Sequence, residues 1–177
     1  MKNTEKVLVD FTAVGEQEQW FVVNDGVMGG LSQGRFAIET DGNALFHGRL
    51  SLENNGGFSS IRRAPRDYGL SGFAGVTLRV RGDGRTYQFR LRMSDRFDAI
   101  AYRAEFATQA DTWTTVPIPF TEFEPTFRGR RVPGAPELQP DRIVQIGFLI
   151  ADQQAGPFRL SIDSVRAYTS DSAAGEE

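Results

Sequence analysis

The chain has 177 residues, 40% of them hydrophobic and 24% charged, and its formal net charge is −3. This length suits one domain with a sizeable core, and the small negative charge gives no general attraction to nucleic acid or to an anionic membrane. The absence of cysteine excludes disulfides, thiolate catalysis and cysteine-based zinc sites. The first residues lack the apolar core of a secretory signal, and no apolar run is long enough to span a membrane. We therefore expect a monomeric cytoplasmic protein that does not insert into a membrane.

Hydrophobic and polar residues alternate with a period of two along almost the whole chain. Short alternating runs separated by Gly, Pro and Asp predict an all-β fold, an antiparallel sandwich or barrel of about ten strands. The expected strands cover residues 7–11, 35–40, 44–52, 58–62, 75–81, 86–93, 99–106, 113–120, 142–151 and 158–168. A short helical turn is expected at 16–20, and a shift of phase predicts a β-bulge near Ser164. We expect one domain over residues 1–169 and a disordered acidic tail at 170–177.

The segment WFVVNDGVMGGLSQGRF contains four glycines within nine residues. Asn24 and Asp25 are of types that bond to nearby backbone groups, and Gly29 or Gly30 is expected to have a positive φ. The segment lacks the Gly-Lys-Ser/Thr ending of a phosphate loop, and a strand rather than a helix follows it. We therefore expect a rigid, mainly structural loop, in which Met28 either plugs the end of the sandwich or contacts a partner.

The strands at 75–81 and 86–93 can be placed in register as a hairpin. A four-residue loop at 82–85 puts their apolar positions on one side, with Val80 opposite Tyr87. The other face, continued on the strand at 99–106, then carries a ladder that contains the pairs Gln88–Glu105 and Arg90–Arg103 together with Arg79 and Arg92. Like charges opposite each other repel by up to about 1 kcal/mol. This face is therefore either simply solvated or covered by an anionic or carbonyl-rich partner.

A long irregular segment at 121–141 contains four of the eight prolines. Such excursions from a compact domain are usually functional or flexible. The aromatic and basic residues of this segment favour contact with a partner; they are Phe123, Phe127, Arg128, Arg130 and Arg131. The alternative is a Pro-stiffened strap across the edge of the sandwich.

Residues suited to catalysis are scarce. The single histidine, His47, is expected on the outward face of its strand, and no Gly-x-Ser-x-Gly motif accompanies it, which disfavours a hydrolase triad. One histidine also excludes a histidine-rich metal site. A calcium site on Asp10 and Asp163 stays open, although the chain has no Asp-x-Asp-x-Asp-Gly loop. We expect no catalytic site, no metal and no cofactor.

Five motifs that occur in order resemble the complex I intermediate-associated protein 30 family. They are W…VNDGVMGGLSQG, FHGRLSLENNGGFSSIR, VRGDGRTYQFRLR, W…TVPIPFTEFEPTFRGRRV and IGFLIADQQAGPFRLSIDSV, and the resemblance extends from Phe11 to Tyr168. It implies a jelly-roll β-sandwich similar to galactose-binding-like and carbohydrate-binding modules. It also implies a non-catalytic assembly factor that holds a membrane-arm intermediate of respiratory complex I.

Two classes of function follow. The first is a protein-interaction module that acts in the assembly of a membrane complex, and the second is a module that binds carbohydrate or another small ligand. The outward positions carry Arg, Gln and Glu with few aromatics, which favours the first class over a sugar site. The candidate partner- or ligand-binding residues are Asn24, Asp25, Met28, Arg79, Arg90, Arg92, Arg103, Phe127, Arg128, Arg130 and Arg131.

Overall fold

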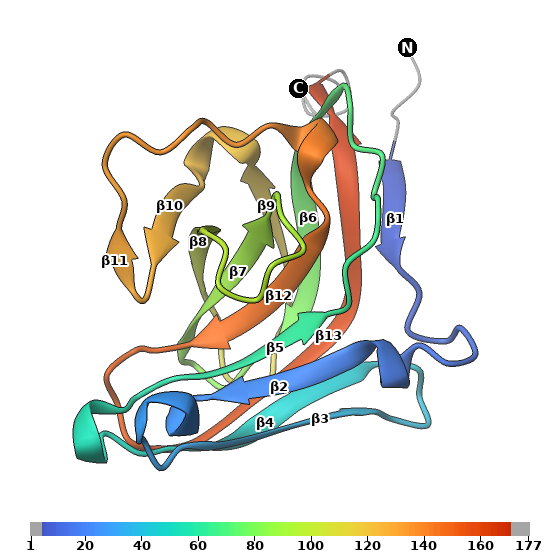
Figure 1. The fold of residues 1–177 in the computed structure, drawn as a ribbon. Coiled ribbons are helices and arrows are strands. Elements are labelled where there is room, and N and C mark those ends of the chain that lie inside the picture. The colour runs from blue at the N-terminus through green and yellow to red at the C-terminus, as the bar shows by residue number, and fades with distance from the viewer. Residues whose placement is uncertain (1–4, 171–177) are drawn as a thin grey trace.

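The computed structural model describes residues 5–170, apart from the side chains of Val27, Met28 and Asn55, and shows two antiparallel β-sheets packed as a jelly-roll sandwich (Figure 1). The expected all-β fold is therefore confirmed. The expected disordered tail lies, except for Ser170, outside the described residues. In the part of the chain that is described, no helix is long and apolar enough to cross a membrane.

Sheet A is built around β13 (Gly156–Thr169), a strand of 14 residues. One edge of β13 pairs first with β4 and then with β1, while its other edge pairs with β6. β3 and β9 extend the sheet beyond β4 and β6. The bounds of these strands are β1 Glu5–Val9, β3 Gln33–Ile38, β4 Ala44–Leu50, β6 Phe73–Arg81 and β9 Trp113–Pro119. The register of β13 shifts between Ile162 and Ser164, which confirms the predicted bulge.

Sheet B has seven strands in the order β11-β10-β8-β7-β12-β5-β2. Their bounds are β2 Trp20–Asn24, β5 Ser59–Arg63, β7 Thr86–Arg92, β8 Ala101–Ala107, β10 Glu124–Phe127, β11 Arg130–Arg131 and β12 Gln145–Ile150. The described residues contain five short 3-10 turns, of which the first four lie between strands of different sheets and the last between two strands of sheet B; they are η1 Gln17–Gln19, η2 Asp25–Met28, η3 Glu53–Asn55, η4 Phe120–Glu122 and η5 Pro140–Arg142.

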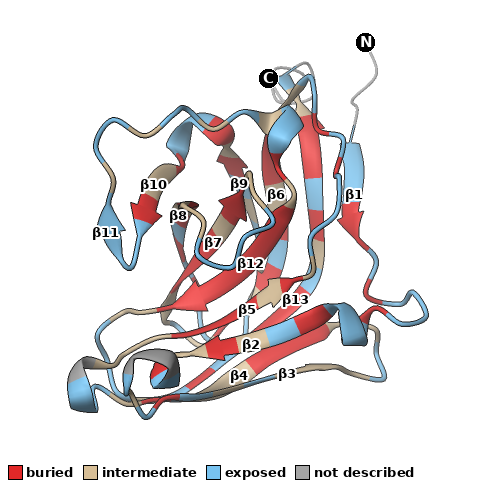
Figure 2. Ribbon diagram, in the orientation of Figure 1, coloured by how far each residue is buried: buried red, intermediate tan, exposed pale blue. Residues whose placement is uncertain are grey.

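The core lies between the two sheets, where the buried positions of the strands face each other (Figure 2). Aromatic rings from both sheets meet there. Phe46 of sheet A contacts Phe158 at 4.9 Å between ring centroids and Tyr87 of sheet B at 6.5 Å. On sheet B, Phe89 packs against Phe148 at 5.1 Å. Because alternate residues of a strand point to opposite sides, this core leaves the polar residues of the same strands on the outer faces.

All ten expected strands are present, and three further strands were not predicted. The turn η1 confirms the helical turn expected at 16–20, and the unpredicted β2 begins directly after it, at Trp20. The Trp20 indole stacks on Phe36 at 5.1 Å and donates a hydrogen bond to the Glu16 carboxylate at 2.9 Å. β10 and β11 form a hairpin inside the 121–141 segment, and their few paired residues are too short a run to show a period of two.

The predicted hairpin between 75–81 and 86–93 was wrong. β6 pairs with β13 and β9 in sheet A, whereas β7 pairs with β12 and β8 in sheet B, so the loop at 82–85 crosses from one sheet to the other. Val80 lies between Ile162 and Thr114 rather than opposite Tyr87. The apolar pattern did not distinguish the two arrangements, because strands that face each other across a sandwich also turn their apolar sides together.

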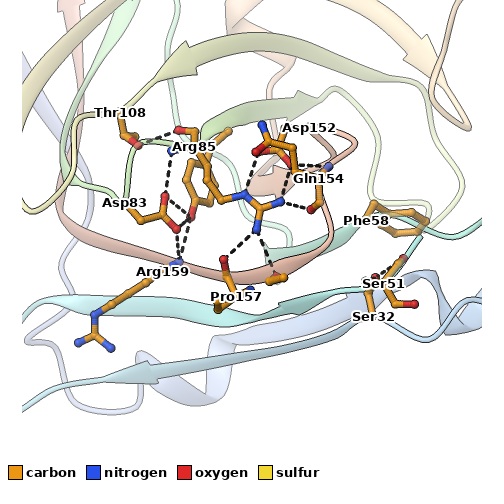
Figure 3. A network of polar contacts seen from close by, with 12 residues as sticks. Ser32, Ser51, Phe58, Asp83, Arg85, Thr108, Asp152, Gln154, Pro157 and Arg159 are labelled. Atoms are coloured by element: carbon orange, nitrogen blue, oxygen red, sulfur yellow. Dashed lines mark hydrogen bonds and ion pairs between the residues drawn. The ribbon is translucent and has the colours of Figure 1, made fainter. Parts of the chain in front are cut away.

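Arg85 holds this crossing loop against the segment that joins β12 to β13 (Figure 3). Its guanidinium forms a bidentate ion pair with Asp152, with nitrogen–oxygen distances of 2.6 and 2.9 Å. It also donates to the backbone carbonyls of Gln154, Gly156 and Pro157. The hydrogen bond to Asp152 raises the pKa of Arg85.

Asp83, at the start of the same loop, binds the beginning of β13. Its carboxylate accepts hydrogen bonds from the Tyr87 hydroxyl at 3.1 Å and from the backbone N–H of Arg159 at 2.7 Å (Figure 3). Thr108 adds a third link, because its hydroxyl donates to the Arg85 carbonyl at 2.7 Å. The loop that changes sheets is therefore fixed by polar contacts at one end of the sandwich.

We expect Arg85→Lys to lower the free energy of unfolding by about 2 kcal/mol, because lysine keeps the charge but cannot form the planar, two-bonded contact with buried Asp152. Urea denaturation measures the effect. Arg166→Lys is the matched control, since Arg166 is exposed on β13 and the same exchange should change stability by less than about 0.5 kcal/mol. Equal stabilities of the two variants would contradict a structural role for the contact.

Candidate functional site

The outer face of sheet B is hollowed into a cleft of about 710 Å³, within the range of small-molecule sites. Four arginines from strands β5, β7 and β8 line it: Arg62, Arg90, Arg92 and Arg103. The loop between β7 and β8 passes in front of sheet B and contributes Phe97 (Figure 1). Other parts of the rim come from the turn of the β10–β11 hairpin and from loop residues 56–58 and 151–153. The cleft therefore combines a rigid strand floor with a loop-built rim.

Strand register places Arg90 at the centre of the floor. Arg90 pairs with Arg103 of β8 on one side and with Gly147 of β12 on the other, and Gly147 in turn pairs with Arg62 of β5. A Cβ at position 147 would lie 2.5 Å from the Ile61 carbonyl oxygen, so a side chain is excluded between the two arginines. The predicted cross-strand pairs Arg90–Arg103 and Gln88–Glu105 are both confirmed.

Burial sets the electrostatics of this floor. Arg92 is only 5% exposed, and its burial, together with the charges of Arg62 and Arg90, lowers its pKa to about 9. Burial, followed by the charges of Arg62 and Arg103, lowers the pKa of Arg90 to about 10. Burial also lowers the pKa of Arg62. All of these groups keep their proton at neutral pH, so the floor holds several poorly hydrated cations close together.

Within residues 5–170, no carboxylate forms an ion pair with any of these four arginines. Arg90 donates to the Thr126 hydroxyl at 2.9 Å, and Arg62 donates to the Phe97 carbonyl at 2.8 Å with its guanidinium 4.4 Å from the Phe97 ring centroid. The Nε groups of Arg90 and Arg92 are buried and have no hydrogen-bond partner. Unpartnered buried donors are uncommon and costly in native proteins.

The Gly-rich loop is organised by the buried carboxylate of Asp25, which is 0% exposed. The carboxylate accepts hydrogen bonds from the backbone and hydroxyl of Ser32, at 2.8 and 2.6 Å, and from the backbone N–H groups of Gly57 and Phe58, at 2.6 and 3.3 Å. Burial by itself would raise the pKa of Asp25, but these hydrogen bonds outweigh it and the pKa lies below 3.8. Asp25 therefore joins two of the sequence motifs into one structure.

Glycines make this close packing possible. A Cβ on Gly30 would lie 2.3 Å from Cγ of Asp25, and one on Gly56 would lie 2.5 Å from its Oδ2. Gly29 has a φ of +90°, which confirms the expectation for Gly29 or Gly30. Next to Asp25, the side-chain oxygen of Asn24 accepts a hydrogen bond from the Ser59 hydroxyl at 2.5 Å. The polar side chains of this loop are thus bound internally.

The Gly-rich loop and the crossing loop both support the rim of the cleft. Gly57 and Phe58, which donate to Asp25, line the cleft on one side. Gln153, which follows the Arg85 partner Asp152, lines it nearby. These contacts give Asn24 and Asp25 a supporting position behind the rim, and the Met28 side chain lies outside the described residues.

Arg79 does not belong to the cleft, which corrects the predicted ladder. It lies on the outer face of sheet A, 3.8 Å from the Asp163 carboxylate and with its guanidinium 5.3 Å from the Trp113 ring. The error follows from the wrong hairpin, since β6 and β7 belong to different sheets. Asp163, considered as a calcium ligand, is instead half-exposed beside this arginine.

The predicted Phe127–Arg131 segment is placed at the rim as the β10–β11 hairpin. Phe127 and Arg128 line the cleft, with the Arg128 guanidinium 5.3 Å from the Phe127 ring centroid. Arg130 and Arg131 are exposed on β11, and Arg131 lies 4.0 Å from the Glu124 carboxylate. Of this segment, the structure brings Phe127 and Arg128 together with the floor arginines.

Two residues of the cleft were missed by the sequence analysis. Arg62 alternates with buried Ile61 in the expected strand at 58–62, so the sequence could have predicted that its side chain points outward. The sequence could not predict which residues surround Arg62, because β5 pairs with the distant β12. Phe97 lies in an irregular loop with no periodic signal.

His47 lies away from the cleft on sheet A, between Arg35 and Arg159, and burial and these two charges lower its pKa. Among the described residues, no group of three or more His, Asp or Glu could hold a metal.

Residues 9–162 match the model of the family described as Complex I intermediate-associated protein 30. The chain belongs to the complex I intermediate-associated protein 30 family. The mitochondrial protein of this name from Mus musculus is 31% identical over 93% of this chain and 56% of its own length. The Drosophila melanogaster protein is 26% identical over 90% of the chain and 61% of its own length. This chain therefore spans little more than half of these two family members.

An uncharacterized protein of Schizosaccharomyces pombe is 32% identical over 86% of this chain and 81% of its own length. Among solved structures, a family 11 carbohydrate-binding module of Clostridium thermocellum, in complex with a β-1,3-1,4-mixed-linked tetrasaccharide, has a TM-score of 0.70 at 18% identity and covers 96% of this chain and 97% of its own. An agarase has a TM-score of 0.63 at 11% identity, covering 93% of this chain and 24% of its own. At these identities the likeness establishes the jelly-roll fold and nothing further.

We expect Asp25→Asn to lower the free energy of unfolding by about 2–3 kcal/mol at neutral pH, because the amide cannot accept all the hydrogen bonds that the carboxylate accepts. The folded-state pKa of Asp25 is lowered, so its contribution is fully present above the unfolded value of 3.8 and is lost as the pH falls through the folded-state pKa. The difference between the two proteins should therefore shrink below this pH.

Chemical denaturation at several pH values measures this effect. Asp163→Asn serves as the control, since Asp163 is half-exposed and its removal should cost less than about 1 kcal/mol. A loss in Asp25→Asn no larger than that of the control would rule out the proposed anchoring role.

Arg92→Met should raise the free energy of unfolding by about 1–3 kcal/mol in the absence of any ligand, because it removes a buried, unpaired cation at nearly constant volume. Thermal and urea denaturation measure the change, and Arg166→Met controls for loss of an exposed arginine. If Arg92→Met is less stable than the unaltered protein, Arg92 makes a net favourable contribution to the fold and the stated cost of its burial is wrong.

Proposed function

We propose that the chain is a non-catalytic protein-interaction module that acts in the assembly of respiratory complex I or a similar membrane complex. Family membership supports the assembly role, and the arginine-lined cleft on sheet B supports a recognition surface. The observation that carries the proposal is that Arg62, Arg90, Arg92 and Arg103 share this face and form no ion pair with a carboxylate among the described residues, although Asp98 and Glu105 line the same cleft. Cations arranged in this way favour an anionic or carbonyl-rich surface.

The rim of the cleft is suited to a protein partner. Phe97 and Phe127 are large apolar side chains that are 56% and 38% exposed. Arg103 and Arg128 stand near them along the same cleft. Aromatic residues and arginine are the types most enriched in binding hot spots. We assign the partner contact to this rim, with the exposed Arg130 and Arg131 of β11 extending it.

A carbohydrate- or small-ligand-binding module is the second candidate. The same cleft favours it, because exposed aromatic rings beside planar polar groups can stack on and hydrogen-bond a sugar, and Phe97 and Phe127 lie beside Gln88 and Arg103. The high density of arginine favours the first candidate, since a neutral sugar would leave these charges uncompensated.

The cellular compartment and the absence of catalysis stay predictions. The relatives from Mus musculus and Drosophila melanogaster are named as mitochondrial, whereas the sequence led us to expect the cytoplasm. A non-catalytic role is supported by the position of His47, which lies on sheet A away from the cleft. We also expect the module to act as a monomer and without nucleic acid.

We expect the double variant Arg103→Glu/Arg128→Glu to capture complex I subunits at least about tenfold less efficiently than the unaltered protein, a loss of about 1.4 kcal/mol. Both residues line the cleft, and reversal at position 103 places a carboxylate beside Arg90, so folding should be preserved. The measurement is affinity capture from detergent-solubilised membranes of the native organism, with subunits quantified by mass spectrometry.

Arg35→Glu/Arg166→Glu is the matched control, because it makes the same charge change on exposed residues of sheet A. Unchanged capture by the cleft variant, with its fold confirmed by circular dichroism, would remove the cleft as the partner surface. A glycan array tests the second candidate: saturable binding of a soluble oligosaccharide that is lost in Phe97→Ala/Phe127→Ala would favour it over the first.

A further inference from the structure

The floor of the cleft differs from its rim in how its charges are held. A small hollow of about 10 Å³ beside Gly147 is lined by Arg62, Arg90 and Arg92. This is roughly the volume that one water molecule needs. Ser60 and Gly147 also line this hollow. The three arginines therefore share one spot of the sheet surface, and the charges of Arg62 and Arg90 act on Arg92 there.

The polar atoms at this spot are only partly satisfied. Arg92 is 5% exposed and its Nε group has no partner, and the Nε group of Arg90 is likewise buried and unpartnered. Within residues 5–170, the Arg92 guanidinium forms no hydrogen bond. Rim contacts with a large partner would not reach a group buried so deeply. A small ligand group that enters the cleft could.

We propose that Arg62, Arg90 and Arg92 form a binding site for the phosphate group of a small phosphorylated ligand. Three clustered cations are compensated better by a phosphate monoester, with a charge of about −1.5 to −2 and three acceptor oxygens, than by a single carboxylate. The planar forks of arginine match these oxygens in pairs. The Thr126 hydroxyl, which donates to the Ala101 carbonyl at 3.0 Å, accepts a hydrogen bond from Arg90 and so holds this arginine in place.

The rest of the cleft has room for the remainder of such a ligand. Its volume of about 710 Å³ exceeds that of a phosphate group many times over, and Phe97 closes one side over Arg62. The site does not depend on a protein partner, because the arginines assigned to partner contact, Arg103 and Arg128, are not needed for it. The shared chemistry is a phosphate monoester, whether free, on a sugar or on a lipid headgroup.

Isothermal titration calorimetry of the full chain with inorganic phosphate, at low ionic strength and about pH 7.5, tests the site. We expect one site with a Kd below about 1 mM, accompanied by a rise in thermal midpoint. Arg92→Gln should weaken binding at least tenfold, and Arg62→Gln, whose side chain is less deeply buried, should do so as well. Arg166→Gln should bind phosphate like the unaltered protein.

The pH dependence identifies the charge state that is bound. Because the second pKa of a phosphate monoester is about 6, affinity for glucose 6-phosphate should rise between about pH 5.5 and 7.5, while affinity for sulfate, which stays doubly charged, should not. Glucose 6-phosphate and vesicles containing phosphatidic acid test whether the phosphate is carried by a sugar or by a lipid headgroup. Whichever of the two binds more tightly than inorganic phosphate identifies the rest of the ligand. Citrate distinguishes carboxylate recognition, and a preference for citrate over phosphate would overturn the proposal.

Other outcomes also overturn it. These are no heat and no stabilisation at about 10 mM phosphate, ten times the expected Kd, or binding that Arg92→Gln and Arg62→Gln retain with circular dichroism unchanged. An equal loss in Arg166→Gln would show a general effect of charge instead. Because Arg92→Gln and Arg62→Gln leave Arg103 and Arg128 in place, these variants should lose phosphate binding and keep partner capture, so the two functions can be separated.

Discussion

The buried carboxylate of Asp25 is the contact on which the architecture around the cleft depends. It gathers N–H and O–H donors from two segments far apart in the chain, and the glycines at 30 and 56 are there because a side chain would occupy its space. A desolvated anion needs this many donors to remain ionised. Once the donors are fixed, the segment at 56–58 has one position, and this segment is part of the rim. A residue that never reaches the surface thus shapes the surface.

The floor of the cleft presents the opposite situation, in which buried charges are left without partners. Arg85 shows how the same fold treats a structural arginine: Asp152 and three carbonyls satisfy it. Arg92 is buried to a comparable degree and receives nothing similar. The chain satisfies the Arg85 guanidinium fully but leaves Arg90 and Arg92 of the cleft unsatisfied. This lowers the stability of the fold locally, and such costs concentrate at sites of recognition.

Most of the fold could be predicted from local sequence patterns, because the alternation of apolar and polar residues is a property of each single strand. All ten expected strands exist, and the bulge at Ser164 and the positive φ of Gly29 follow from residues close in sequence. Pairing is a property of the whole chain, and there the sequence was ambiguous: β6 and β7 have matching apolar faces yet belong to different sheets, which moved Arg79 to the wrong side. Arg90, Arg92 and Arg103 were grouped correctly because β7 and β8 are neighbours both in sequence and in space. Arg62 lies beside these arginines only because β5 pairs with β12, which follows it by 80 or more residues in the chain. No short sequence motif encodes such a contact.

The central position of β13 has a consequence for how the domain is made. The longest strand of sheet A, β13, follows the other strands of the sheet in the chain, and β1, β4 and β6 all pair with it. During synthesis, strands made early must therefore remain without their main partner until residues 156–169 emerge from the ribosome. Contacts of such long sequence separation form slowly, and unpaired strand edges invite aggregation in the interval. On this topology, the strands of sheet A that are made before β13 are exposed to such aggregation until residues 156–169 are available to pair with them.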